Sequence, residues 1–177
     1  MRQFIETMTL VIAAAGLVLT PAVLRAGDMS NQASQKLAQA ESLARSVRHN
    51  AGITQTFVRH ATLFTKSSHA RTLSAIKEDS NKLGDVIASL HKSRGEMEDW
   101  QAQLVTRLLP RMESLAADVG SAIRFIDENP QEDFTPMYED YVDGIYNQSN
   151  SIVTSIDRYL DWAEAKRAKE ALQASVK

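Results

Sequence analysis

Apolar residues recur along most of this chain at alternating steps of three and four, and no segment alternates apolar and polar positions in steps of two. Steps of three and four place side chains on one face of an α-helix, so the pattern predicts amphipathic helices and an all-α fold. The clearest stripe is a heptad seam typical of coiled-coil packing, with a single polar member. This seam comprises Leu73, Ile76, Ser80, Leu83, Ile87 and Leu90.

The first half of the chain predicts two helices. The first runs from Ser30 to about Phe64, with a break or kink expected at Gly52. The second covers His69 to Arg94. We expect it to stop at Gly95, because glycine readily adopts the left-handed conformation that closes a helix.

The second half predicts two more helices. One runs from Glu98 to Glu128 and should bend at Pro110, because proline removes a backbone hydrogen bond. The next begins with Thr135 as its N-cap and Pro136 as its first helical residue. Apolar periodicity carries it past Leu172.

Short connections between four amphipathic helices favour an antiparallel up-down-up-down four-helix bundle, which we expect for residues 27–177. About 150 residues is the usual size of one domain, enough to bury about 70% of the unfolded-chain surface. In this arrangement the turns at Ser67 and Pro130 lie at one end. The Gly95 turn, residue 27 and the C-terminus lie at the other.

The N-terminal segment differs from the rest. Residues 8–24 form an apolar run of 17 residues that includes Pro21. A spanning helix needs about 20 apolar residues, so the run favours the hydrophobic region of a signal peptide. Small residues suited to cleavage occur at Thr20-Pro21-Ala22 and at Ala26. The alternative is an uncleaved N-terminal membrane anchor. Residues 1–26 therefore predict export to the periplasm or beyond, either free or tethered to the membrane.

Composition narrows the chemistry. The chain has no cysteine, which excludes disulfides, thiol catalysis and iron–sulfur ligation. Without Arg2, Arg25 and Glu6 of the leader it keeps 18 Lys and Arg against 21 Asp and Glu, a net charge of −3. A mildly acidic chain is a poor match for nucleic acid.

Metal and haem sites are weakly indicated. No Glu-x-x-His sequence occurs, which excludes a ferritin-like di-iron site, and we predict no metal or cofactor site. An alternative is haem held by His60, with Met112 from a facing helix. Acidic residues crowd the end near Pro130, where Lys66, His69 and Arg71 should face them in solvent. These acidic residues are Asp127, Glu128, Glu132, Asp133, Glu139, Asp140 and Asp143.

Aromatic residues suggest two binding features. Trp100 and Trp162 should lie near the same end of the bundle, where a shared surface groove is one interpretation and simple packing another. Four further aromatic residues could line a cavity between helices. They are Phe57, Phe64, Tyr141 and Tyr159.

Three short sequences carry a family resemblance. Glu98-Asp99-Trp100-Gln101 opens the third helix, Ile126-Asp127-Glu128-Asn129 ends it, and Tyr138-Glu139-Asp140-Tyr141 opens the fourth. With the leader and the heptad helix, their order resembles a group of exported, uncharacterised helical-bundle proteins of soil bacteria. The resemblance covers most of residues 35–170. It implies a bundle fold and no known activity.

These observations leave three functional hypotheses. No catalytic residues are predicted, because the chain lacks a phosphate loop, a nucleophile elbow and a cysteine nucleophile. The leading hypothesis is a noncatalytic exported bundle that contacts a protein partner or a second copy of itself in the periplasm or envelope. The alternatives are a bundle that binds or senses a small ligand, and a haem or metal electron carrier.

Overall fold

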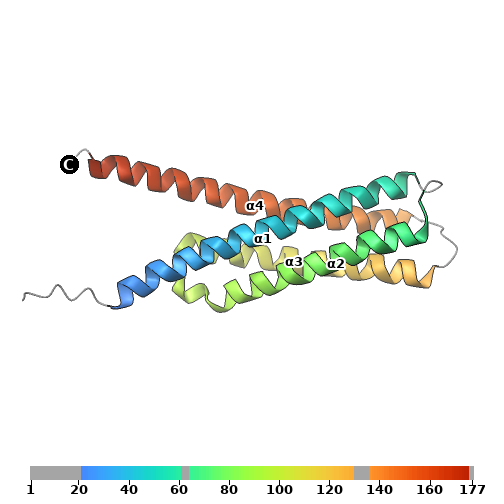
Figure 1. The fold of residues 1–177 in the computed structure, drawn as a ribbon, viewed down its shortest axis with the longest axis horizontal. Helices are drawn as coiled ribbons and strands as arrows, with labels where there is room; N and C mark the ends of the chain where they lie inside the picture. The colour runs from blue at the N-terminus through green and yellow to red at the C-terminus, as the bar shows by residue number, and fades with distance from the viewer. Residues whose placement is uncertain (1–20, 61–63, 130–135, 176–177) are drawn as a thin grey trace, which may run out of the picture.

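The chain forms four long α-helices in a computed structural model, which describes residues 21–60, 64–129 and 136–175, with side chains from residue 31 onward. The helices are α1 (Pro21–Arg59), α2 (Lys66–Lys92), α3 (Asp99–Glu128) and α4 (Pro136–Ser175) (Figure 1). A short 3-10 helix, η2 (Arg94–Glu96), lies between α2 and α3. Within these ranges there is no β-strand, so the predicted all-α class is confirmed.

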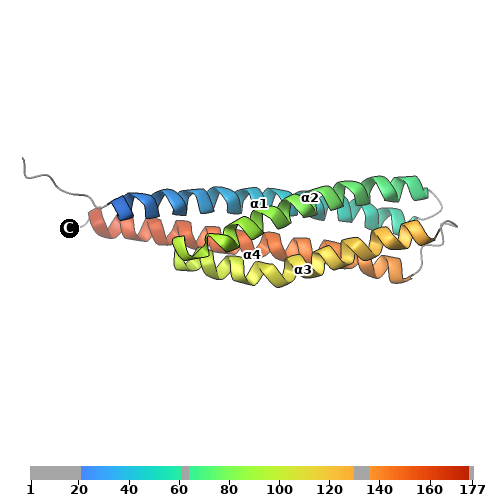
Figure 2. The same ribbon diagram turned by 90° about the horizontal axis from the view of Figure 1, so that it is seen from below.

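The four helices lie lengthwise against one another, and the two ends of the molecule differ (Figures 1 and 2). The last turns of α1 and α3 and the first turns of α2 and α4 lie at one end, which we call the histidine end after His69. The η2 turn lies toward the opposite end, which we call the tryptophan end after Trp100 and Trp162. There the first turns of α1 and the last turns of α4 extend beyond η2 and diverge (Figure 1).

The predicted apolar stripes form the core. All six residues of the heptad seam on α2 are buried, including Ser80. On α3 the stripe is buried at Leu104, Leu108 and Leu115, with Met112 half-buried. The stripe of α1 consists mostly of small residues, which lets neighbouring helices approach closely. Its buried apolar members are Ala33, Leu37, Ala40, Ala44, Val47 and Ala51.

Helix boundaries in the first half differ from the prediction. Helix α1 begins at Pro21 rather than Ser30, so it continues through the predicted cleavage region, and it passes through Gly52 without a break. Helix α2 begins at Lys66, one turn before His69, and ends at Lys92. Gly95 lies inside η2 and its backbone is not left-handed, so it does not close α2.

Boundaries in the second half match closely. Helix α3 ends at Glu128 and continues through Pro110. Helix α4 has Pro136 as its first residue and runs past Leu172, as predicted. The N-cap predicted at Thr135 lies outside the described residues.

Helices α3 and α4 approach closely at Gly144. A methyl group at this position would collide with the carboxyl group of Asp118, whose Cγ would be 2.7 Å away. Burial raises the pKa of Asp118 above its ordinary value. A Cβ at Gly144 therefore has no room unless the Asp118 side chain moves.

None of the helices in the described part is both long and apolar enough to span a bilayer. Residues 8–20, which carry most of the predicted leader, lie outside that part.

Candidate functional site

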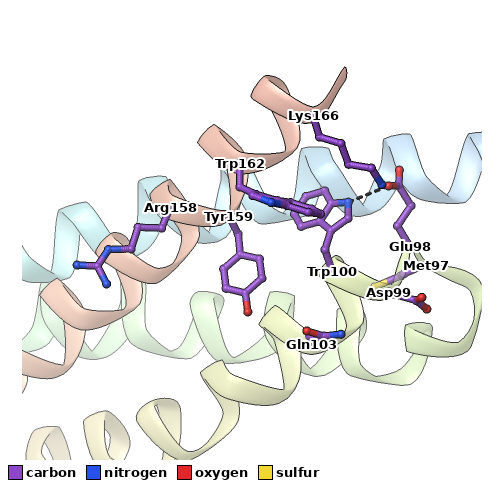
Figure 3. Close-up of a pocket in the computed structure, with 9 residues that line it drawn as sticks. All are labelled: Met97, Glu98, Asp99, Trp100, Gln103, Arg158, Tyr159, Trp162 and Lys166. Carbon is purple, nitrogen blue, oxygen red and sulfur yellow. Dashed lines mark hydrogen bonds between the residues drawn. The ribbon is translucent and has the colours of Figure 1, made fainter. Parts of the chain in front are cut away.

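A network of polar contacts at the start of α3 fixes Trp100. Glu98 and Gln101 form a reciprocal capping box, in which the Gln101 side chain accepts a hydrogen bond from the backbone N–H of Glu98 at 3.1 Å. The buried Gln101 also donates through Nε2 to Ser34 Oγ on α1 at 3.0 Å. Trp100 Nε1 donates to a carboxylate oxygen of Glu98 at 2.8 Å (Figure 3). The indole is therefore held by the helix cap itself.

Trp100 forms the inner wall of a cleft between α3 and α4. Its ring centroid lies 6.4 Å from that of Trp162 in an edge-to-face arrangement, and 6.5 Å from that of Tyr159 in a stacked one. Trp100 is 6% exposed, whereas Trp162 is 50% exposed. The structure thus brings together the two tryptophans that the sequence placed near one end.

This tryptophan cleft has a volume of about 870 Å³. Its charged side chains are of both signs, and Lys166 lies over the Trp162 ring with Nζ 5.5 Å from the centroid. Arg158 extends from α4 away from the tryptophan rings (Figure 3). The lining residues are Met97, Glu98, Asp99, Trp100, Gln103, Arg158, Tyr159, Trp162 and Lys166.

A second cavity of about 570 Å³ continues along the same seam, and we call it the arginine groove. It shares Arg158 and Tyr159 with the tryptophan cleft and adds Arg107 and Arg111 from α3. Arg107 lies over the Tyr159 ring, with its guanidinium carbon 5.8 Å from the centroid. Pro110, Ser114, Gln148 and Ser155 complete the lining, so no acidic side chain is part of it.

Only part of the lining of this groove can be predicted from the sequence. Arg107 and Arg111 are four residues apart, which places both on one face of a helix. Nothing in the spacing of residues within α4 says that Arg158 faces them. That juxtaposition depends on the register of α3 against α4, which periodicity alone does not determine.

The histidine end contains a buried polar pair, His69 and Tyr138. His69 was expected in solvent facing acidic residues, but its side chain is fully buried, and Nδ1 is hydrogen bonded to the hydroxyl of Tyr138 at 3.0 Å. The His69 ring packs edge-on against Tyr138 and Phe57. Burial raises the pKa of Tyr138 well above its ordinary value. His69 lies four residues before Leu73, so extending the heptad seam backward would have placed it in the core.

The other candidate residues are not brought together. Phe57 stacks on Phe64 near His69, whereas Tyr159 lies at the tryptophan end, so the predicted common cavity does not form. His60 is exposed just after α1.

Met112 lies far from His60. Its Cε lies 3.9 Å from where a Cβ of Gly84 would be, and Gly84 is eighteen residues into α2, about 27 Å along the helix from its start. The hypothesis of haem held between His60 and Met112 is therefore wrong.

The acidic residues near the histidine end do not gather around a common point. Asp127, Glu128, Glu139 and Asp140 are exposed, and Glu132 and Asp133 lie outside the described residues. Asp143 accepts a hydrogen bond from Gln55 Nε2 at 2.7 Å. Across residues 21–60, 64–129 and 136–175, no three His, Asp or Glu side chains are grouped as metal ligands.

Comparison with known proteins adds no assignment: no family model, no curated protein and no solved structure matches this chain. The resemblance to exported bundle proteins of soil bacteria stays a prediction.

Proposed function

We propose that this chain is a noncatalytic, exported binding protein: an up-down-up-down four-helix bundle that acts by contact with a protein partner in the periplasm or at the envelope. The tryptophan cleft is the observation that carries the proposal. Half-exposed tryptophan is enriched at binding surfaces, because a large rigid ring contributes contact area at low entropic cost. The apolar run at residues 8–24 supports export.

The lining of the cleft supports a noncatalytic role. Its nine described residues include no histidine, serine or threonine, so a nucleophile paired with a histidine base is missing from this set. The carboxylate of Glu98 is engaged by Trp100 and by the helix cap. Such a lining offers contact area, charge and hydrogen bonds for binding.

Capture from envelope extracts tests the proposal. Immobilised wild-type protein should retain a partner that Trp162→Ala no longer retains. Leu172→Ala is the matched control, because Leu172 is a 68% exposed apolar residue on the same helix outside the cleft. Equal capture by all three proteins would place binding elsewhere and contradict the proposal. N-terminal sequencing of protein from cell fractions tests export, which recovery of the unprocessed chain in the cytosol would exclude.

A small-ligand-binding role is the second candidate, and the dimensions of the cleft favour it. A volume of about 870 Å³ lies within the range of about 300–1,000 Å³ that is usual for small-molecule sites. A thermal-shift screen should then show compounds that stabilise the wild type but not Trp162→Ala.

A further inference from the structure

The tryptophan cleft and the arginine groove adjoin each other along the α3–α4 seam. Arg158 and Tyr159 belong to both cavities. The cavities differ in character, since one is lined by indole rings and the other by three guanidinium groups. A ligand that follows the seam therefore meets an aromatic part and a cationic part.

The three arginines of the groove have no carboxylate in direct contact within the described residues. Within the described part of the chain, Arg107, Arg111 and Arg158 form no ion pair and no hydrogen bond. Arg45 on α1 provides the contrast, because it bonds both Glu41 and Asp157 at 2.6 to 3.0 Å. Three unpaired arginines in one cavity, on a chain whose net charge is −2, create a local positive potential.

Guanidinium groups match the geometry of oxyanions. Each presents several N–H donors in one plane, suited to carboxylate, sulfonate or phosphate oxygens. The neighbouring indole and phenol rings offer flat apolar faces for stacking. Charge complementarity thus favours a small ligand that combines a planar apolar body with an acidic group.

We infer that the α3–α4 seam binds a small organic anion, whose planar body packs against Trp162 and Tyr159 and whose oxyanion contacts Arg111 and Arg158. The inference rests on the second candidate of the proposed function, small-ligand binding at the tryptophan cleft, and it names the chemistry of that ligand. The combined seam is large enough, since the cavities measure about 870 and 570 Å³.

Two fluorescent probes with nearly the same aromatic body test this inference. Anilinonaphthalene sulfonate carries the acidic group, and phenylnaphthylamine is its neutral analogue. The chain has two tryptophans, and both line the cleft, so energy transfer from tryptophan to probe reports binding in the neighbourhood of the cleft, and the variants below locate the site. The sulfonate should bind more tightly than the neutral probe, and its affinity should fall with added salt because exposed charges are screened.

Variants of the arginines measure their contribution to the affinity for the sulfonate. Arg111→Gln with Arg158→Gln should weaken binding of the sulfonate by about tenfold or more and leave the neutral probe unchanged. Arg71→Gln is the matched control, because Arg71 is an exposed arginine on α2 outside the seam, and it should change neither affinity. Melting curves check that each variant is folded, since partly folded proteins also bind the sulfonate. Arg158→Gln alone, at an exposed position, serves if the double variant is unstable.

The possible outcomes separate the binding of an anion from the role of the tryptophan cleft as a binding surface. Equal affinity for both probes, or sulfonate binding that the arginine variants do not change, would overturn the anion inference while leaving the tryptophan cleft as a binding surface. If neither probe shows energy transfer, the inference fails. The proposed function fails separately, when partner capture does not depend on Trp162.

Discussion

The two ends of this bundle use aromatic residues in opposite ways. At the histidine end, Phe57 and Tyr138 pack against the buried His69, and Phe125 stacks on Tyr138. At the tryptophan end, Trp162 is half exposed over an open cleft. Four helices overlap at the first end, whereas α1 and α4 diverge at the second (Figure 1). The comparison teaches that the end where the helices diverge still buries Trp100 but leaves Trp162 half exposed, whereas the end where four helices overlap encloses its buried pair of His69 and Tyr138.

Truncating one aromatic residue at each end gives the largest contrast. Tyr138→Ala should lower the free energy of unfolding by about 3–5 kcal/mol, because it removes a fully buried ring and leaves a cavity. Trp162→Ala should lower it by about 1 kcal/mol, mostly through the lost pair with Trp100. Urea unfolding monitored by circular dichroism measures both. Equal losses would mean that the two ends are packed alike.

A smaller change in stability is expected from filling the space between Gly144 on α4 and Asp118 on α3. Gly144→Ala should destabilise the protein by about 1–3 kcal/mol, because its methyl group would overlap Asp118. Gly120→Ala is the control: a Cβ there meets nothing within 4 Å, so alanine should stabilise the helix by about 0.5–1 kcal/mol. A stabilising effect at both positions would show that α3 and α4 are not in close contact at Gly144. Combining Gly144→Ala with Asp118→Ala should recover most of the loss.

The smallest predicted effect is a pH dependence at the same contact. Burial raises the pKa of Asp118 in the folded state above its unfolded value, so its ionised form opposes folding. This penalty is complete above the folded-state pKa and disappears as the pH falls below the unfolded one. Asp118→Asn should therefore stabilise the protein at neutral pH and have no effect near pH 3. A variant that is less stable than the wild type at neutral pH would contradict the assignment.

The spacing of apolar residues correctly predicted which face of each helix is buried. It did not predict features that depend on a side chain from another helix. The seam from Leu73 to Leu90 is buried as expected, because the spacing of residues within one helix is enough to predict which of them share a face. His69 was predicted to be exposed because of its polarity, but the hydrogen bond to the opposing Tyr138 hydroxyl offsets the cost of burying it. Arg158 and Arg111 line the same groove because of how α4 is aligned lengthwise against α3. That alignment is set by packing along the whole length of both helices.

Boundary errors have a similar physical origin. Gly95 was expected to close α2, but the helix ends three residues earlier, where the Ser93 hydroxyl and N–H bond the carbonyl groups of Ser89 and Leu90. Gly52 was expected to break α1, yet a Cβ there would be in ordinary contact with Tyr146, 3.8 Å away. Packing against α4 therefore keeps α1 helical at Gly52, although glycine has a low helix propensity.

The most direct test of the division between the two ends measures stability and binding on the same samples. For Tyr138→Phe, we predict a loss of about 1–3 kcal/mol in the free energy of unfolding, from the missing hydrogen bond to His69, and unchanged binding of anilinonaphthalene sulfonate. For Trp162→Ala, we predict a loss of only about 1 kcal/mol in the free energy of unfolding, from the missing pair with Trp100, and loss of sulfonate binding as measured by the fluorescence of the directly excited probe. If stability and binding fell together in both variants, the tryptophan end would be part of the folded core rather than a separate binding surface.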